Sequence, residues 1–113
     1  MYPLPKCDEL KFLVGLKISE VKMFDYTAII KFENSPIEIN GWRECLFTKH
    51  DHTQKRSAFD ERGSLTNHKI KQIYIENEEL YLNLDNDFEI VLSGKDKKYE
   101  CFTISADQTT FVV

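Results

Sequence analysis

The sequence predicts a mainly β fold, in which two antiparallel β-meander repeats pack as a sandwich or a half-barrel. Three observations lead to this prediction. Apolar residues recur at every second position in several short runs, which places alternate side chains on one face of a sheet. Segments rich in Asn, Asp and Gly, which are typical of tight turns, separate the runs. The same order of runs and turns occurs twice, in residues 16–47 and again in residues 68–105.

The clearest meander lies between Ile70 and Leu92. Its three apolar runs comprise Ile73 and Ile75, then Leu80, Leu82 and Leu84, and then Phe88, Ile90 and Leu92. Polar segments at residues 76–79 and 85–87 separate these runs, and Asn and Asp tolerate the backbone angles of tight turns. We therefore expect three short antiparallel strands that share one apolar face.

The same apolar skeleton occurs earlier in the chain. When Ile18 is aligned on Ile70, the residues Val21, Met23, Ala28, Ile30 and Phe32 fall on Ile73, Ile75, Leu80, Leu82 and Leu84. After changes in length, Ile37 and Ile39 match Phe88 and Ile90, and Glu44-Cys45 matches Glu100-Cys101. Alternation is common to all β-meanders, so two unrelated meanders would also align in this way. Under either interpretation, each half has an apolar face that the other half must cover.

The remaining segments complete a single domain over residues 1–113, a length that suits one hydrophobic core. Residues 1–9, which include Pro3 and Pro5, are expected to form an extended arm. Residues 42–47 and 99–105 are expected to add a strand to each half, and residues 109–113 a last strand. The polar connection 48–67 is longer than usual. One short helix is expected in the 50–65 region, as a turn over residues 57–62 that Gly63 ends.

Composition limits the classes of function. Fifteen basic and nineteen acidic residues give a net charge of −4, whereas general nucleic-acid binders usually carry a basic excess. The longest apolar run is three residues, which predicts no transmembrane helix. The N-terminal sequence shows no secretory signal. The three cysteines include no CxxC pair, so a reduced, cytoplasmic protein is expected.

The second meander carries an unusual excess of negative charge. Between Gln72 and Gly94 there is no Lys or Arg, and alternation places two tyrosines on the outward face of these strands. Tyrosine is a frequent anchor of protein interfaces, and an acidic surface suits a basic partner. The predicted partner-binding residues are Glu76, Glu78, Glu79, Asp85, Asp87, Glu89, Tyr74 and Tyr81. The two acidic clusters are expected at opposite ends of one strand. The alternative is that these acids only protect turns and sheet edges.

Two other sets of residues, in or next to the 48–69 segment, could carry chemistry. Cys45, His50, Asp51 and His52 lie within eight residues, with His68 further on; they could bind zinc, or His50 or His52 could activate Cys45 as a nucleophile. Solvated histidines and a buried thiol explain the same residues, and no metal or cofactor is predicted. The same segment is also basic, through Lys49, Lys55, Arg56, Arg62 and Lys69. A nucleic-acid patch is the further alternative, although nearby acids balance it.

Residues 70–105, from the I-x-x-I-x-I pattern to Tyr99-Glu100-Cys101-Phe102, resemble small bacterial immunity proteins of contact-dependent growth inhibition and polymorphic toxin systems. The resemblance implies a non-enzymatic inhibitor that binds a co-produced toxin, commonly a nuclease, and blocks its active site. The immunity residues of such proteins vary too much to be transferred individually. An acidic face fits the implied function independently, because nucleases present basic clefts to phosphates.

Overall fold

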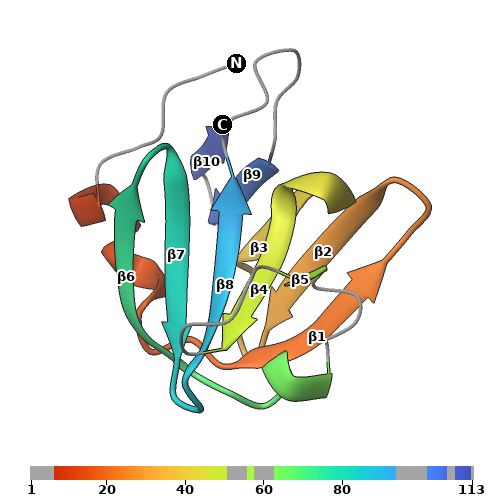
Figure 1. The fold of residues 1–113 in the computed structure, drawn as a ribbon. Coiled ribbons are helices and arrows are strands. Elements are labelled where there is room, and N and C mark those ends of the chain that lie inside the picture. Colours follow the sequence, from red (N-terminus) through yellow and green to blue (C-terminus); the bar gives the residue numbers. More distant parts are fainter. Residues whose placement is uncertain (1–6, 51–55, 58–62, 94–101, 107–108, 113) are drawn as a thin grey trace.

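The computed structural model describes residues 7–50, 56–57, 63–93, 102–106 and 109–112, and it confirms a mainly β fold (Figure 1). Two antiparallel sheets pack face to face. Sheet 1 has the strand order β1 (Ile18–Met23), β2 (Thr27–Phe32), β3 (Glu38–Trp42), β9 (Phe102–Ala106) and β10 (Thr109–Val112). Sheet 2 has the order β5 (Arg56–Ser57), β4 (Leu46–His50), β8 (Phe88–Ser93), β7 (Glu79–Leu84) and β6 (Ile70–Glu76). Within the described strands, neither sheet closes into a barrel.

The two halves of the chain exchange their fourth strands. Each half places a three-stranded meander in one sheet, β1–β3 in sheet 1 and β6–β8 in sheet 2. The next strand of each half then crosses to the other sheet, so that β4 pairs with β8 and β9 pairs with β3. The apolar face of each half predicted that the halves cover one another, but the sequence pattern did not predict this exchange. The crossing strands add main-chain hydrogen bonds between the halves to their apolar contact.

Hydrogen bonds at the junction between β1 and β6 repeat at an offset of 52 residues. The amide of Ile18 donates to the carbonyl of His68, and the amide of Ile70 donates to the carbonyl of Leu16. In the same way Gly15 donates to Ile70, and Asn67 donates to Ile18. Such reciprocal bonds are what a local twofold axis produces. Gly15 and Asn67 both have a positive φ, at 94° and 70°, a conformation that Gly and Asn tolerate best.

The strand registers agree with the same offset. In both meanders the first strand has a β-bulge directly after its first residue, between Ile18 and Glu20 in β1 and between Ile70 and Gln72 in β6. A bulge changes which side chains face the core. Its presence at both positions explains why the alternation in each first strand is irregular. Cys45 of the first Glu-Cys pair lies directly before β4, whereas both residues of the second pair, Glu100 and Cys101, lie outside the described residues.

The apolar residues predicted from alternation meet between the sheets. They include Ile18, Ile30, Phe32, Ile39 and Ile104 from sheet 1, and Ile70, Leu80, Leu82, Leu84, Ile90 and Leu92 from sheet 2. Full burial of one such side chain stabilises a fold by about 1.5–3 kcal/mol relative to its exposure. Leu10, Leu13 and Leu65 add apolar residues from outside the strands. One core therefore accounts for both repeats.

Three short segments differ from the expectations. The proposed extended arm is wrong for residues 7–9, because they begin the 3-10 helix η1 (Cys7–Leu13), whose Leu10 and Leu13 are buried. The fourth run of the first half is not one strand: the 3-10 helix η2 (Arg43–Cys45) separates Trp42 from β4. The expected short helix is present at residues 63–65, so Gly63 does not end it; residues 58–62 lie outside the described range. Among all the described residues, no helix is long and apolar enough to cross a membrane.

Candidate functional site

The two tyrosines of the predicted site stack on the outer face of sheet 2, which points away from the core. Tyr74 of β6 and Tyr81 of β7 are register partners. Their ring centroids are 4.5 Å apart and their planes differ by 3°. Cross-strand aromatic pairs of this kind stabilise a sheet by about 0.2–1 kcal/mol. The stack fixes both rings, so that their hydroxyl groups have defined positions.

Each tyrosine hydroxyl donates a hydrogen bond to a carboxylate of the predicted set. Tyr74 Oη lies 2.8 Å from Glu89 Oε2, and Tyr81 Oη lies 2.9 Å from Glu79 Oε1. Burial, followed by the hydrogen bond to Glu79, raises the pKa of Tyr81 to about 12. Burial, followed by the hydrogen bond to Glu89, also raises the pKa of Tyr74. Both hydroxyls therefore remain donors far above neutral pH.

Glu79 and Tyr81 are not exposed contact residues, which corrects the prediction for these two positions. Glu79 is 3% exposed and Tyr81 is 9% exposed. Both lie on β7, which has β6 on one side and β8 on the other, and Tyr81 stands between Tyr74 and the buried Val91. Alternation predicts the face on which a side chain lies, but the neighbouring strands decide how much of it reaches solvent.

Basic residues from outside the acidic window lie beside the β7–β8 turn. His68 Nδ1 is 2.7 Å from Asp85 Oδ1, and the Lys69 amide donates to Asp85 Oδ2 at 3.4 Å. Lys71 Nζ lies 4.0 Å from Asp87 Oδ1. The hydrogen bond from His68 is the main cause that lowers the pKa of Asp85. The negative charge at this end of β7 is therefore partly compensated.

The β6–β7 turn lies at the opposite end of β7 (Figure 1). Its carboxylates, unlike those of the β7–β8 turn, are not compensated by a basic residue in the described ranges. Glu76 and Glu78 are both exposed, and no ion pair joins either of them to another residue in the described ranges. Asn77 and Glu78 have φ values of 51° and 63°. These left-handed values fit the tight two-residue turn that joins antiparallel strands. The turn therefore holds two carboxylates at a defined end of the sheet.

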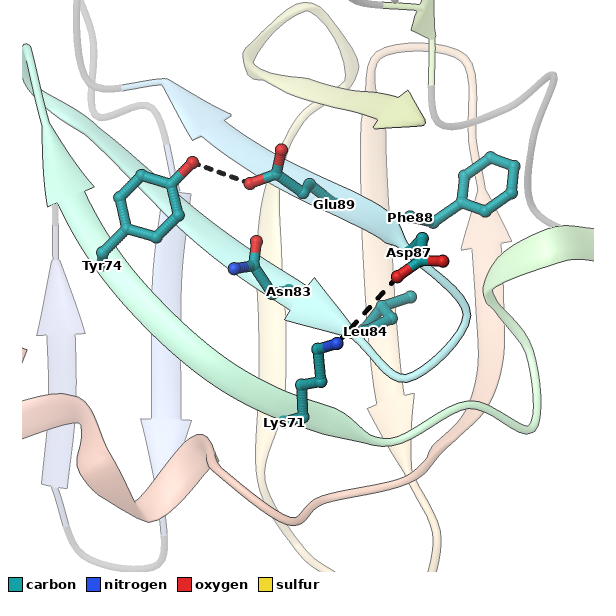
Figure 2. Close-up of a pocket in the computed structure, with 7 residues that line it drawn as sticks. All are labelled: Lys71, Tyr74, Asn83, Leu84, Asp87, Phe88 and Glu89. Atoms are coloured by element: carbon teal, nitrogen blue, oxygen red, sulfur yellow. Dashed lines mark hydrogen bonds and ion pairs between the residues drawn. The ribbon is translucent and has the colours of Figure 1, made fainter. Parts of the chain in front are cut away.

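A pocket of about 260 Å³ lies on sheet 2 (Figure 2). We call it the Asn83 pocket; it is lined by Lys71, Tyr74, Asn83, Leu84, Asp87, Phe88 and Glu89. Figure 2 shows Asn83 between the Tyr74–Glu89 hydrogen bond and the Lys71–Asp87 ion pair. The Oδ1 atom of Asn83 is buried and accepts no hydrogen bond from the residues that the structure describes. Asn83, Lys71 and Phe88 were not predicted as site residues, because the pocket forms only when β6, β7 and β8 pair.

The predicted residues for metal binding and nucleophilic catalysis do not form a site in the described chain. Cys45 is buried before β4, whereas His50 ends that strand and stacks on Phe88 with ring centroids 4.4 Å apart. Five extended residues span roughly 16 Å, which separates this thiol from this imidazole. Among the described residues, no three His, Cys, Asp or Glu side chains form a group that could hold a metal. Asp51 and His52 lie outside this range.

The basic residues of segment 48–69 are only partly described. Lys55 and Arg62 lie outside the described ranges. Lys49 belongs to β4, whereas Lys69 precedes β6 and forms a β-bridge with Lys17. β8 and β7 lie between β4 and β6 in the sheet. The two lysines therefore do not belong to one patch.

Exposed aromatic residues lie at the end of sheet 1 and were not predicted as functional. Phe24, Tyr26 and Trp42 are 50%, 75% and 37% exposed. Arg43 joins them, because its backbone amide donates to Tyr26 O and its guanidinium donates to Phe24 O. At the offset of 52 residues, Phe24 and Tyr26 correspond to Glu76 and Glu78. The sequence does contain a signal for this surface: two aromatic residues, Phe24 and Tyr26, stand at a turn whose equivalent in the second repeat is acidic.

Comparison of the chain with protein families, curated proteins and solved structures finds no match. The resemblance of residues 70–105 to immunity proteins therefore stays a prediction. Of its Tyr-Glu-Cys-Phe signature, only the backbone of Phe102 lies in the described ranges, where it begins β9. The geometry of sheet 2 is the basis for a functional proposal.

Proposed function

We propose that the chain is a non-enzymatic binding protein that neutralises a protein partner with a basic surface, as an immunity protein neutralises its toxin. The observation that carries this proposal is the charge at the β6–β7 turn. Glu76 and Glu78 are exposed and lack an ion pair in the described residues. A pair of uncompensated carboxylates at one end of a sheet attracts a basic partner and accelerates its association.

The backbone of the turn adds support. Glu78 has a φ of 63°, where a residue with a side chain costs about 1 kcal/mol relative to glycine. Asn-Gly is the favoured sequence for such a turn. A carboxylate at this position therefore lowers stability, and backbone strain of this kind often accompanies function.

The ion pairs of sheet 2 define where the partner would bind. Asp85 and Asp87 interact with His68 and Lys71, so they attract a basic partner less than the β6–β7 turn does. Glu79 is buried and cannot take part directly. The proposed contact region therefore centres on Glu76 and Glu78 and extends along β6 to Tyr74. A nuclease, with its basic phosphate-binding cleft, is the kind of toxin that this surface suits.

The partner in the test is the protein encoded directly upstream of this chain's own gene, where the proposal expects the toxin domain. Its binding to the chain is measured by stopped-flow fluorescence, and cell survival is measured on co-expression. We expect the double variant Glu76→Lys/Glu78→Lys to associate at least about tenfold more slowly, and to protect cells less. The control Glu20→Lys/Asp25→Lys changes the net charge equally at exposed positions of the other repeat and should keep both properties.

Two results would overturn the proposal. In the first, the chain neither binds the upstream toxin domain nor protects cells against it. In the second, the charge-reversed β6–β7 turn binds and protects as the unchanged chain does. A salt series separates steering from contact, because screening slows association of the unchanged chain, whereas it weakens like-charge repulsion in the charge-reversed variant and does not slow its association.

A further inference from the structure

The Asn83 pocket has acceptors that lack a donor. Asn83 Oδ1 is buried, and no group of the described residues donates a hydrogen bond to it, which is unfavourable for a buried acceptor. Glu89 lies on the neighbouring strand, in register with Asn83. Its Oε2 accepts from Tyr74, whereas within the described residues its Oε1 has no hydrogen bond. The pocket thus offers a carboxylate oxygen to an incoming donor, beside a buried amide oxygen that becomes available if the Asn83 side chain turns.

The other repeat shows which donor suits this arrangement. Lys31 of β2 and Glu38 of β3 are register partners on sheet 1, as Asn83 and Glu89 are on sheet 2. Lys31 and Asn83 are 52 positions apart, so they occupy equivalent places. In sheet 1, Lys31 Nζ lies 3.7 Å from Glu38 Oε1. In sheet 2, the shorter and neutral Asn83 replaces this cation and the pocket is open in front of it.

Neither lysine near the pocket pairs with Glu89 in the way that Lys31 pairs with Glu38 in sheet 1. Lys71 lines the pocket but lies against Asp87, at 4.0 Å. Lys49 is the register partner of Glu89 on β4, yet no ion pair joins these two described side chains. The Glu89 carboxylate instead hydrogen-bonds Tyr74, on the opposite side from β4 (Figure 2). A further positive charge is therefore favourable at Glu89.

We propose that the Asn83 pocket receives an arginine side chain of the protein partner. This inference rests on the function proposed above and names the group that the binding face recognises. A guanidinium carries five N–H donors in one plane, so it can donate to Glu89 and, when the Asn83 side chain turns its amide oxygen toward the pocket, to Asn83 as well. Tyr74 lines the same pocket and offers an aromatic ring to the cation. A volume of about 260 Å³ suits a side chain better than a drug-sized ligand.

The test titrates the full chain with Nα-acetyl-arginine methylamide and follows backbone and Asn83 side-chain amides by NMR. The matched probe is the citrulline analogue, which has the same shape but no charge. We expect saturable shifts at residues 74, 83 and 89 with a dissociation constant on the order of millimolar. Binding of the citrulline probe should be about five- to tenfold weaker.

Variants assign the binding to this pocket. Glu89→Gln and Asn83→Leu should each weaken arginine binding about fivefold or more. Glu38→Gln removes the equivalent carboxylate of sheet 1 and should leave it unchanged. Thermal unfolding confirms that each variant is folded. If Asn83→Leu does not fold, the Glu89→Gln variant alone decides whether arginine binds in the pocket. The inference is overturned if no saturable shift occurs at the pocket, or if citrulline binds as well as arginine.

Binding of the upstream toxin domain separates this inference from the proposed function. If Glu89→Gln weakens toxin binding while Glu38→Gln does not, both stand. If toxin binding depends on Glu76 and Glu78 but not on Glu89 or Asn83, the arginine inference falls and the proposed function stands. If the toxin domain does not bind the unchanged chain, the proposed function falls first, whatever the arginine probe shows.

Discussion

Replacing Tyr81 with Phe tests the buried tyrosine–carboxylate pair. The change removes one hydroxyl group and keeps the ring that stacks on Tyr74. Its hydroxyl lies 2.9 Å from Glu79 Oε1, and Glu79 is only 3% exposed. Water therefore has little access to replace the lost donor. Tyr74→Phe is the matched control. It removes the hydroxyl that Tyr74 donates at 2.8 Å to Glu89, which is only half-buried and can be solvated.

The two substitutions should differ in their effect on stability. A hydrogen bond to a charged group contributes about 1.5–3 kcal/mol. Glu79 also takes part in a further interaction, so Tyr81→Phe should cost about 1.5 kcal/mol, near the lower limit. Water can solvate Glu89 after Tyr74→Phe, which should cost only about 0.5 kcal/mol. For a domain of this size the difference corresponds to about 4 °C in Tm.

Urea unfolding of the unchanged chain and both variants measures these values. A double-mutant cycle of Tyr81→Phe with Glu79→Gln then isolates the pair, for which we expect a coupling energy of about 1 kcal/mol. The reasoning is refuted if the two tyrosine variants are equally stable, or if Tyr81 and Glu79 show no coupling. Either result would mean that solvent reaches Glu79 in solution.

Three further predictions concern the turns and the titrating groups of sheet 2. Glu78→Gly should raise the free energy of unfolding by about 0.5–1 kcal/mol, because glycine adopts the left-handed backbone without strain; Asn77→Gly should gain less in the same assay. The His68 hydrogen bond lowers the pKa of Asp85, so this carboxylate stabilises the fold above its ordinary pKa, and the contribution is lost as pH falls through the lowered value. NMR titration of His68→Ala should show that pKa returning upward; an unchanged value would exclude His68 as the cause. Because the pKa of Tyr81 is raised to about 12, stability should fall as pH rises from the ordinary tyrosine value of about 10 towards about 12. Tyr81→Phe should reduce that alkaline loss of stability, which urea unfolding at a series of alkaline pH values measures; ultraviolet absorbance of the phenolate follows the ionisation of the tyrosine.

Several features of the chain could be predicted from local sequence alone. Alternation predicted the strands of both meanders and their buried residues, such as Ile30 and Leu82. The offset between these two residues, 52 positions, also relates the hydrogen bonds at the junction of the halves. These predictions succeed because the period of two depends only on the geometry of an extended strand.

Exposure and charge compensation could not be predicted in this way. The window from Gln72 to Gly94 contains no Lys or Arg, yet His68 and Lys71 lie beside the acids of the β7–β8 turn. Because β6 and β7 are antiparallel, the start of β6 lies beside the end of β7, where the β7–β8 turn begins. Residues at or just before the start of β6 therefore lie next to this turn. Charge counted along a window therefore differs from charge at a surface.

The sequence by itself determined which residues can form strands, which face of each strand is apolar, and where acidic residues are in excess. Only the tertiary structure decided that β4 and β9 exchange between the sheets. It also decided that Glu79 is buried, and that Asn83 and Glu89 form a pocket with unused acceptors. The physical reason is that strand pairing joins residues distant in sequence. Burial and electrostatic potential depend on those neighbours rather than on the local pattern.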